Sequence, residues 1–304
     1  MENIKTMTLK YIKYKYLFLM MLPGLSFYVV FHYVPIYGLQ IAFKDYMFKL
    51  GIWGSPWIGF RNFTDLFFAE SFRQVFRNTI VLSLYQLIFG FPAPIFFAIF
   101  LYEIRNVVFK KTIQTISYLP HFVSWVILGG LFLQFLSPSI GPINAVLRSL
   151  GMKPVYFLAD PKWFRTVVVS THIWKNVGWS SIVYLAALTG IDPELYNAGD
   201  MDGANRFQKI IYITLPSLIP VVTIMLIFSI GRIINDNFNQ IFNLYNPSVY
   251  SVGDVISTYA YRMGLVKMQY SSAAAIELFK NIISFSLVVM ANSVAKRINE
   301  YGIW

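Results

Sequence analysis

The sequence predicts an all-α polytopic membrane protein. Hydrophobic residues make up 57% of the 304 positions and charged residues only 13%, which is far more apolar than a soluble domain with a hydrated surface. No Asp, Glu, Lys or Arg occurs at positions 16–43, 78–102, 112–147 or 210–231. Each of these stretches exceeds the roughly 20 residues that a helix needs to cross a bilayer. They therefore predict membrane spans.

Two further spans contain charges. Positions 165–188 hold Lys175 near the middle, and positions 273–293 hold Glu277 and Lys280 near the start. Backbone groups in lipid must bond internally, and runs such as VILGGLFLQFL do not alternate as barrel strands do, so the spans should be helices. We predict six transmembrane helices in a single transmembrane domain at positions 16–304. Their expected positions are about 16–37, 78–102, 112–136, 165–188, 217–239 and 273–293.

The first 15 residues form a basic segment, with Lys5, Lys10, Lys13 and Lys15 before the first span. Lysines before a span favour the cytoplasmic side, and an even number of spans places both termini there. The span itself is long, is interrupted by Pro23 and Pro35, and lacks a small-x-small cleavage site, so we expect a retained helix and no cleaved signal peptide. The loops at 103–111 and 190–216 should then also be cytoplasmic.

The composition excludes several kinds of site. The chain has no cysteine, and His32, His121 and His172 are scattered without metal-ligand spacing, so neither a disulfide framework nor a metal site is expected. The net charge of +11 is attributed to basic residues that lie next to the membrane and face anionic lipid. The sequence shows no nucleic-acid site. No phosphate-binding loop motif is present, so any ATP must be bound by another chain. No cofactor is expected here.

A polar passage at 194–216, ELYNAGDMDGANRFQKIIYITLP, lies between two very apolar regions. Asp192 suits a helix N-cap, Pro193 the first helical position and Glu194 the first turn. Gly203 would supply the left-handed residue that ends this helix, and its position directly after the acids excludes a calcium loop of the EF-hand type. A short surface helix should therefore begin at residue 193.

A second helix should follow, with an apolar stripe, before Pro216 opens the fifth span. The stripe comprises Phe207, Ile210, Ile211 and Thr214. On the first helix, Leu195, Ala198 and Gly199 share one face, whose small residues permit close approach by a partner. The pattern fits either a docking device or an ordinary pair of interfacial helices.

The passage resembles the EAA loop of binding-protein-dependent ABC importer permeases. The matching residues are Ala198, Asp202, Gly203, Ala204, Ile213, Leu215 and Pro216. Similarity extends to LPG at 22–24, YVPIYGLQIAFKDY at 33–46, SYLPHFVSW at 117–125, DVISTYAYRMGL at 254–265 and the terminal GIW. This set resembles the polysaccharide and oligosaccharide branch of the carbohydrate-type permeases.

The resemblance implies the type I ABC importer permease fold and a set of partners. These are a second homologous permease, two copies of a cytoplasmic ATPase that binds ATP and Mg, and an extracellular sugar-binding protein, which would be a tethered lipoprotein in a cell with one membrane. It also implies that the EAA helix docks in the ATPase and transmits nucleotide-driven closure. The implied coupling residues are Glu194, Asn197, Ala198, Gly199, Asp200, Asp202, Gly203 and Ala204.

Two departures from the family pattern concern this loop. Asn197 stands where the family has an acid, and Gly199 replaces the second alanine. Asp200 or Glu194 could supply the missing charge. On the other side of the membrane, GPINAVLRSLGMKPVYFLADPKW at 141–163 resembles the loop that reaches toward a docked binding protein, although a lid packed on the helix ends fits as well.

Polar residues at membrane depth normally face a cavity or a partner. The substrate-binding candidates are Lys175, Asn176, Ser229, Arg232, Asn235, Asp236 and Asn239. The aromatic rings of Trp174, Trp179 and Phe238 could cover sugar C–H surfaces. Arg232 and Asp236 stand four apart and could instead satisfy each other. If Lys175 and Arg232 both face the translocation path, their positive charges favour an acidic oligosaccharide as the cargo over a neutral one.

Two other classes remain open. A secondary transporter for a polar solute would explain the spans and the buried charges, but it should show an internal repeat and has no use for a docking helix. An integral-membrane glycan-processing protein would need clustered acids or histidines, whereas the acids here are dispersed. The sequence therefore favours a transport subunit without catalytic residues of its own, in the cytoplasmic membrane of a bacterium.

Overall fold

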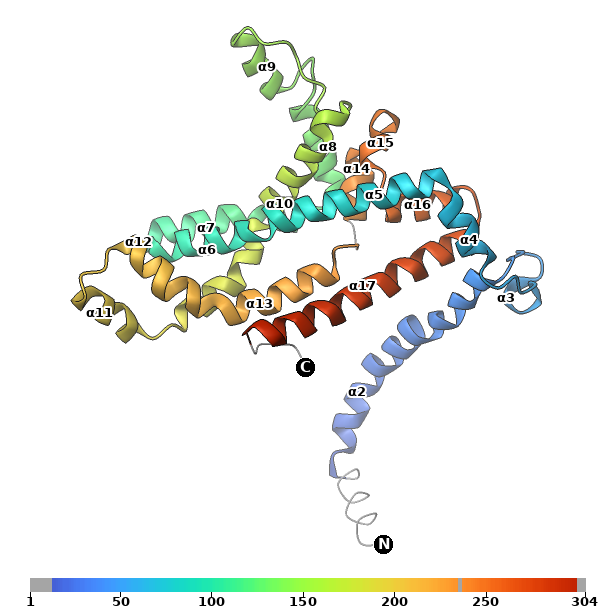
Figure 1. Ribbon diagram of the computed structural model, residues 1–304, viewed down its shortest axis with the longest axis horizontal. Helices are drawn as coiled ribbons and strands as arrows, with labels where there is room; N and C mark the ends of the chain where they lie inside the picture. The colour runs from blue at the N-terminus through green and yellow to red at the C-terminus, as the bar shows by residue number, and fades with distance from the viewer. Residues whose placement is uncertain (1–12, 235–236, 300–304) are drawn as a thin grey trace.

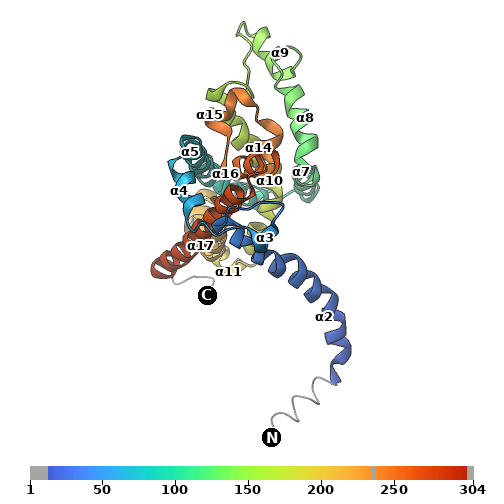
Figure 2. The ribbon, with the colours of Figure 1, turned by 90° about the vertical axis from the view of Figure 1, so that its right-hand side faces the viewer.

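The structure is a computed structural model that describes residues 13–234 and 237–299 (Figure 1). Helices dominate these ranges, within which no strand occurs and a single antiparallel bridge joins Lys44 to Trp57. The all-α prediction is confirmed. Long helices run side by side in a bundle, from which α9 projects at one side and α2 at another (Figures 1 and 2).

Four helical runs are long and apolar enough to cross a membrane. Lys15–Phe43 contains α2 (Lys15–Tyr28), η1 (Val29–Tyr33) and η2 (Val34–Phe43). Glu70–Glu103 contains α5 (Glu70–Tyr85), η3 (Gln86–Gly90) and α6 (Pro92–Glu103). Arg206–Gly231 contains α12 (Arg206–Lys209), η4 (Ile210–Thr214) and α13 (Leu215–Gly231). Tyr270–Arg297 lies in α17 (Tyr270–Asn299). The first, second and sixth predicted spans fall within three of these runs.

The third predicted span is wrong as a single helix. Residues 112–136 divide between α7 (Val107–Phe122) and α8 (Trp125–Phe135), which are bent by 104° at the break. Val123 takes an extended conformation there, and the Ser124 hydroxyl accepts a hydrogen bond from the Ile127 amide to begin α8. If this bent pair is one span, the described chain has five.

The fourth predicted span lies within α10 (Pro161–Thr189). At 29 residues this helix is about 43 Å long, but it is not among the helices apolar enough to cross a membrane by composition. The predicted total of six is therefore only partly supported. α10 instead occupies the middle of the bundle, where it packs against α6, α7 and α13.

The fifth predicted span has different ends from those expected. It begins at Arg206, because the π-helical turn η4 joins α12 to α13 without a break at Pro216. It stops at Gly231, and a separate helix, α14, starts at Phe238. The second helix of the polar passage is therefore the first turn of the span. A π turn shifts the hydrogen-bond register by one residue, so the missing N–H of Pro216 does not interrupt the helix.

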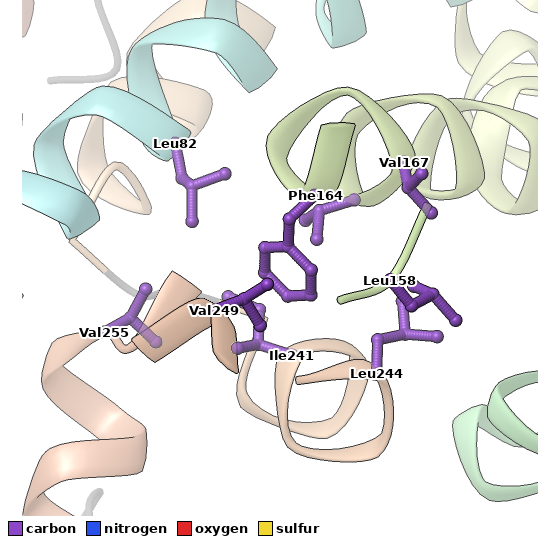
Figure 3. Close-up of a cluster of buried hydrophobic side chains, with 9 residues drawn as sticks. Leu82, Leu158, Phe164, Val167, Ile241, Leu244, Val249 and Val255 are labelled. Carbon is purple, nitrogen blue, oxygen red and sulfur yellow. The ribbon is translucent and has the colours of Figure 1, made fainter. Parts of the chain in front are cut away.

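Short helices fill the connections between the long ones. They are α3 (Gly51–Gly54), α4 (Arg61–Phe68), α9 (Pro142–Ser149), α11 (Pro193–Met201), α14 (Phe238–Leu244), η5 (Pro247–Val249), α15 (Tyr250–Gly253), α16 (Ile256–Tyr261) and η6 (Arg262–Val266). In one buried cluster, Phe164 of α10 is surrounded by side chains from α5, α14 and the segment around α15 (Figure 3). An added Cβ on Gly253 would lie 2.3 Å from its ring. This cluster fixes the start of α10 against α15.

The first helix makes little contact with the rest of the chain. None of the α2 residues is buried, and α2 points away from the bundle in both views (Figures 1 and 2). Leu, Phe, Met and Tyr side chains are exposed along its length. A helix that is apolar on all sides needs lipid or another membrane helix around it. The expected basic segment 1–15 lies almost wholly outside the described residues.

Gly178 allows α10 to approach α7 closely. A Cβ at this position would lie 2.3 Å from the backbone oxygen of Ser117. We expect Gly178→Ala to push the two helices apart and to lower stability by about 1–3 kcal/mol, measured as a lower thermal midpoint of the detergent-solubilised protein. Gly130→Ala is the matched control, because no atom lies within 4 Å of the added group. Equal midpoints for the two variants would contradict the close packing.

Candidate functional site

The short helix α11 forms as predicted. The Asp192 carboxylate accepts a hydrogen bond from the Glu194 amide at 2.9 Å, and Pro193 is the first helical residue. Gly203 has a φ of +73°, the left-handed conformation that glycine adopts most easily. The Asn205 and Gln208 side chains then cap the next helix reciprocally. Local capping chemistry therefore sets both ends of the loop.

One face of α11 is held against the following span. The Tyr196 hydroxyl lies 3.0 Å from the Thr214 hydroxyl, and the Lys209 ammonium lies 2.6 Å from Asp200 Oδ1. A Cβ on Gly199 would lie 3.1 Å from Ile213 Cδ1. Gly199 therefore serves close packing within this chain. Asp200 is paired with Lys209 within this chain, whereas Glu194 is exposed.

The opposite face of α11 is exposed. Glu194, Asn197, Ala198 and Asp202 are all exposed, as is Gly203 in the turn. Apolar groups are exposed with them, since Leu195 is 49% and Met201 90% accessible. Ala204, by contrast, is half-buried. A helix anchored on one side, with small, apolar and acidic groups on the other, has the makeup of a docking element for another protein.

A cavity of about 410 Å³ lies in the middle of the bundle, between the Glu70–Glu103 run, α10 and α13. Its polar lining combines hydroxyl, amide, imidazole and guanidinium groups with aromatic rings. The polar and aromatic lining residues are Ser83, Gln86, Phe91, His172, Trp179, Ser180, Tyr184, Phe228, Ser229, Arg232 and Asn237. Such a mixture suits a polyhydroxylated ligand, because the ligand's hydroxyls can hydrogen-bond to the amides and its C–H faces can pack on the aromatic rings.

The cavity includes only part of the predicted substrate set. Ser229 and Arg232 line it, whereas Lys175, Asn176 and Asn239 do not. Of the predicted aromatic residues, Trp179 lines it, and Trp174 and Phe238 do not. The predicted candidates Asn235 and Asp236 lie outside the described residues, and so does the alternative Arg232–Asp236 pair.

Lys175 bonds to the protein rather than facing the cavity. Its side chain is buried, and its ammonium donates to the backbone oxygens of Pro120, His121 and Val123 at 3.0, 2.7 and 2.7 Å. These carbonyls lie at the end of α7, where helix geometry leaves the last acceptors without intrahelical partners. All three ammonium donors are thus engaged. The hypothesis of a free Lys175 cation in the path does not fit this geometry.

Asn176 is also engaged at the junction of α7 and α10. Its side-chain oxygen lies 3.1 Å from His121 Nδ1, and its amide group donates to the His172 carbonyl at 3.1 Å. The His121 ring in turn stacks on Trp179, with ring centroids 4.6 Å apart. Asn176 therefore supports the Trp179 face of the cavity from behind.

Sequence reasoning offered Asn237 among the polar residues of the fifth span but missed Gln86 and His172 as lining residues of the cavity. Asn237 Nδ2 donates to Gln86 Oε1 at 3.2 Å and lies 3.0 Å from His172 Nδ1. These three side chains come from the Gln86 π turn, from α10 and from the segment before α14. Gln86 is a polar residue within the long apolar stretch 78–102, so its membrane depth alone was a usable signal. The pairing with Asn237, 151 positions away, had no sequence signal.

Comparison with known proteins identifies the family. Residues 66–300 match the family described as the binding-protein-dependent transport system inner membrane component. The chain belongs to this family. The permease is 41% identical to Protein LplB of Bacillus subtilis (strain 168), over 95% of this chain and 91% of the relative. It is also 41% identical to the polygalacturonan/rhamnogalacturonan transport system permease protein YteP of that organism, over 100% of this chain and 94% of that relative.

Solved structures agree with this assignment. A chain of a bacterial ABC transporter involved in the import of the acidic polysaccharide alginate superposes with a TM-score of 0.90 at 41% identity, over 97% of the permease and 99% of that chain. A second crystal structure shows the alginate transporter in complex with its alginate pentasaccharide-bound periplasmic protein, with a TM-score of 0.89. The type I ABC permease fold predicted from the EAA resemblance is confirmed, and the relatives are transport subunits.

Lys175 and Arg232 should respond differently to the same substitution. We expect Lys175→Met to leave α7 carbonyls without donors, to lower stability by about 1–3 kcal/mol and to reduce uptake of every cargo alike. Arg232 is exposed, so Arg232→Met should keep stability within about 0.5 kcal/mol and reduce uptake of an acidic oligosaccharide most. Thermal midpoints and uptake of matched acidic and neutral oligosaccharides measure both. If Lys175→Met were stable and reduced uptake of acidic oligosaccharides only, Lys175 would have to face the translocation path.

Proposed function

We propose that the permease is the membrane subunit of an ATP-driven importer for an oligosaccharide. An extracellular binding protein delivers the cargo, the bundle takes it into the central cavity, and a change from an outward-open to an inward-open state releases it into the cytoplasm. The observation that carries this proposal is the pairing of a polar, aromatic cavity at mid-bundle with an anchored, outwardly exposed helix at one end. Family membership supports both roles.

The ATPase in this proposal is a separate chain that docks on α11. Two copies would bind ATP and Mg, one on this permease and one on a second, homologous permease subunit. Because Tyr196 and Asp200 tie α11 to the Arg206–Gly231 run, a push on the exposed face would move that run. Ser229 near its far end lines the cavity, as does Arg232 just beyond it. α11 would then be cytoplasmic, together with both termini, in the cell membrane.

The cargo proposed is an acidic oligosaccharide. Arg232 offers a guanidinium in the cavity, and a carboxylate would accept paired hydrogen bonds from it. The names of two similar proteins point the same way, since one carries polygalacturonan or rhamnogalacturonan and another the acidic polysaccharide alginate. The α9 segment, which projects from the bundle (Figure 1), is proposed to contact the binding protein. The similar alginate transporter forms a complex with a periplasmic protein.

Gly203 tests the coupling role of α11. We expect Gly203→Val to insert normally in the membrane but to abolish transport, because a β-branched residue at a φ of +73° costs about 1–2 kcal/mol and misplaces the helix. Gly203→Asn is the matched control, since asparagine tolerates this conformation. Co-purification of the ATPase and uptake rate are the measurements. Wild-type uptake by an assembled Gly203→Val complex would refute the docking role.

Asn197 tests whether the docking cleft keeps a basic partner. Asn197 is exposed on α11, so a new charge there costs little desolvation. We expect Asn197→Glu to leave ATPase association unchanged or to tighten it, because a carboxylate makes stronger charge-assisted bonds than an amide. Asn197→Gln controls for side-chain length. A clear loss of association for Asn197→Glu alone would mean that the cleft is adapted to asparagine.

A further inference from the structure

A second cavity, of about 560 Å³, lies beside the start of the Glu70–Glu103 run. It is formed by the first turns of α5, the beginning of α10 and the turn at α15, and it shares no lining residue with the central cavity. Three arginines line it: Arg73 and Arg77 from α5, and Arg165 from α10. We call this group the arginine cradle.

The cradle carries an excess of positive charge. Glu70 is the one acid among the described residues that line it. None of the four ion pairs found in the described part of the chain involves an arginine of the cradle. On α5, Glu70, Arg73, Gln74 and Arg77 stand at i, i+3, i+4 and i+7, so all four project from one face of the helix. Arg73 and Arg77 are both exposed.

Arg165 is held in place by the protein. Its Nη2 donates to Asn78 Oδ1 at 2.9 Å, and its Nε donates to the Val252 carbonyl at 3.2 Å. Asn78 is itself fixed, because its amide group donates to the carbonyls of Ser251 and Asp254 at 3.1 and 3.2 Å. These bonds occupy the Nε–Nη2 edge of the guanidinium. The Nη1–Nη2 edge is left for a bidentate acceptor, and its orientation is set before any ligand arrives.

The cradle lies further from α11 than the central cavity does. Arg77 precedes Gln86 by nine positions on one helical run, which corresponds to about 13 Å along the axis. In the other direction, the same run ends at Glu103, where the Tyr102 ring lies 6.4 Å from that of Tyr196 in α11. If α11 faces the cytoplasm, a cargo coming from outside reaches the cradle first.

We infer that the arginine cradle binds the carboxylate groups of an acidic oligosaccharide at the outward end of the permease, before the chain enters the central cavity. This inference rests on the proposed import function. A neutral glycan would gain little from three cations, whereas a uronate oligosaccharide places carboxylates at regular intervals and can engage Arg165 and the α5 arginines together. The fixed guanidinium sets the position of the first carboxylate, and the exposed Arg73 and Arg77 receive its neighbours.

The test uses the complete transporter with its binding protein, reconstituted in liposomes. Uptake is measured for oligogalacturonate and alginate oligosaccharides, each beside its methyl ester, which has the same length but no charge. The variants are the double variant Arg73→Met/Arg77→Met and the single variant Arg165→Lys. The lysine keeps the positive charge but cannot donate the two parallel hydrogen bonds of a guanidinium. Arg61→Met is the matched control, because Arg61 is an exposed arginine of the preceding helix with only a long, 3.9 Å contact to Asp65.

The double variant should raise KM for the charged oligosaccharides about 3- to 10-fold, with little change in maximal rate or in KM for the esters. The effect should shrink as salt is added, because exposed charges are screened. Arg165→Lys should show a smaller rise of the same kind, and Arg61→Met should match the wild type. Equal losses for charged and esterified cargo, or no loss, overturn the cradle and leave the import function standing.

Two further outcomes separate the explanations. If the double variant loses stimulation of the ATPase by the binding protein whether or not cargo is bound, the arginines contact acidic residues of a protein partner, and the inference is overturned. If the wild-type transporter imports none of the oligosaccharides, charged or esterified, the proposed cargo class fails, and the cradle inference fails with it. Cargo-selective loss alone supports the cradle.

Discussion

The three hydrogen bonds from the Lys175 ammonium to the end of α7 are the interaction on which the rest of the bundle depends. The 104° break between α7 and α8 leaves carbonyls at the end of α7 without helical partners. A buried lysine on the neighbouring helix supplies the donors. Because Gly178 also brings α10 against Ser117, the break, the contact between α7 and α10, and the wall of the cavity at Trp179 are fixed together.

The polar groups of the bundle divide according to their partners. Lys175, Asn176 and Asn78 make several bonds to backbone or to neighbouring side chains and hold helices together. Ser229 and Arg232 line an open cavity instead. Burying a polar group without a partner is costly, so a side chain satisfied by the protein has little left to offer a ligand. A polar residue's position in a predicted span therefore does not show whether it bonds within the protein or lines the cavity.

The exposed helix α11 and the cavity are connected by a single helical run. Tyr196 and Asp200 bond to residues at the start of Arg206–Gly231, and Ser229 near its end reaches the cavity. Helices are stiff over this length, and packed interfaces tend to switch between discrete arrangements rather than deform continuously. In the proposed mechanism, a displacement of one end of this run would move the other end. The π turn η4 keeps the run continuous past Pro216.

The sequence by itself determined the helical membrane class, the position of α11, the left-handed Gly203 and the family. Each depends on local signals: charge-free length, capping residues, glycine and a contiguous motif. The break within residues 112–136, the engagement of Lys175, the Gln86–His172–Asn237 contact and the three-arginine cavity were decided only by tertiary structure. They join residues far apart in the chain, such as Arg165 and Asn78, 87 positions away. Whether a polar side chain meets a carbonyl or an open cavity depends on which helix packs beside it, and hydrophobic periodicity does not specify that neighbour.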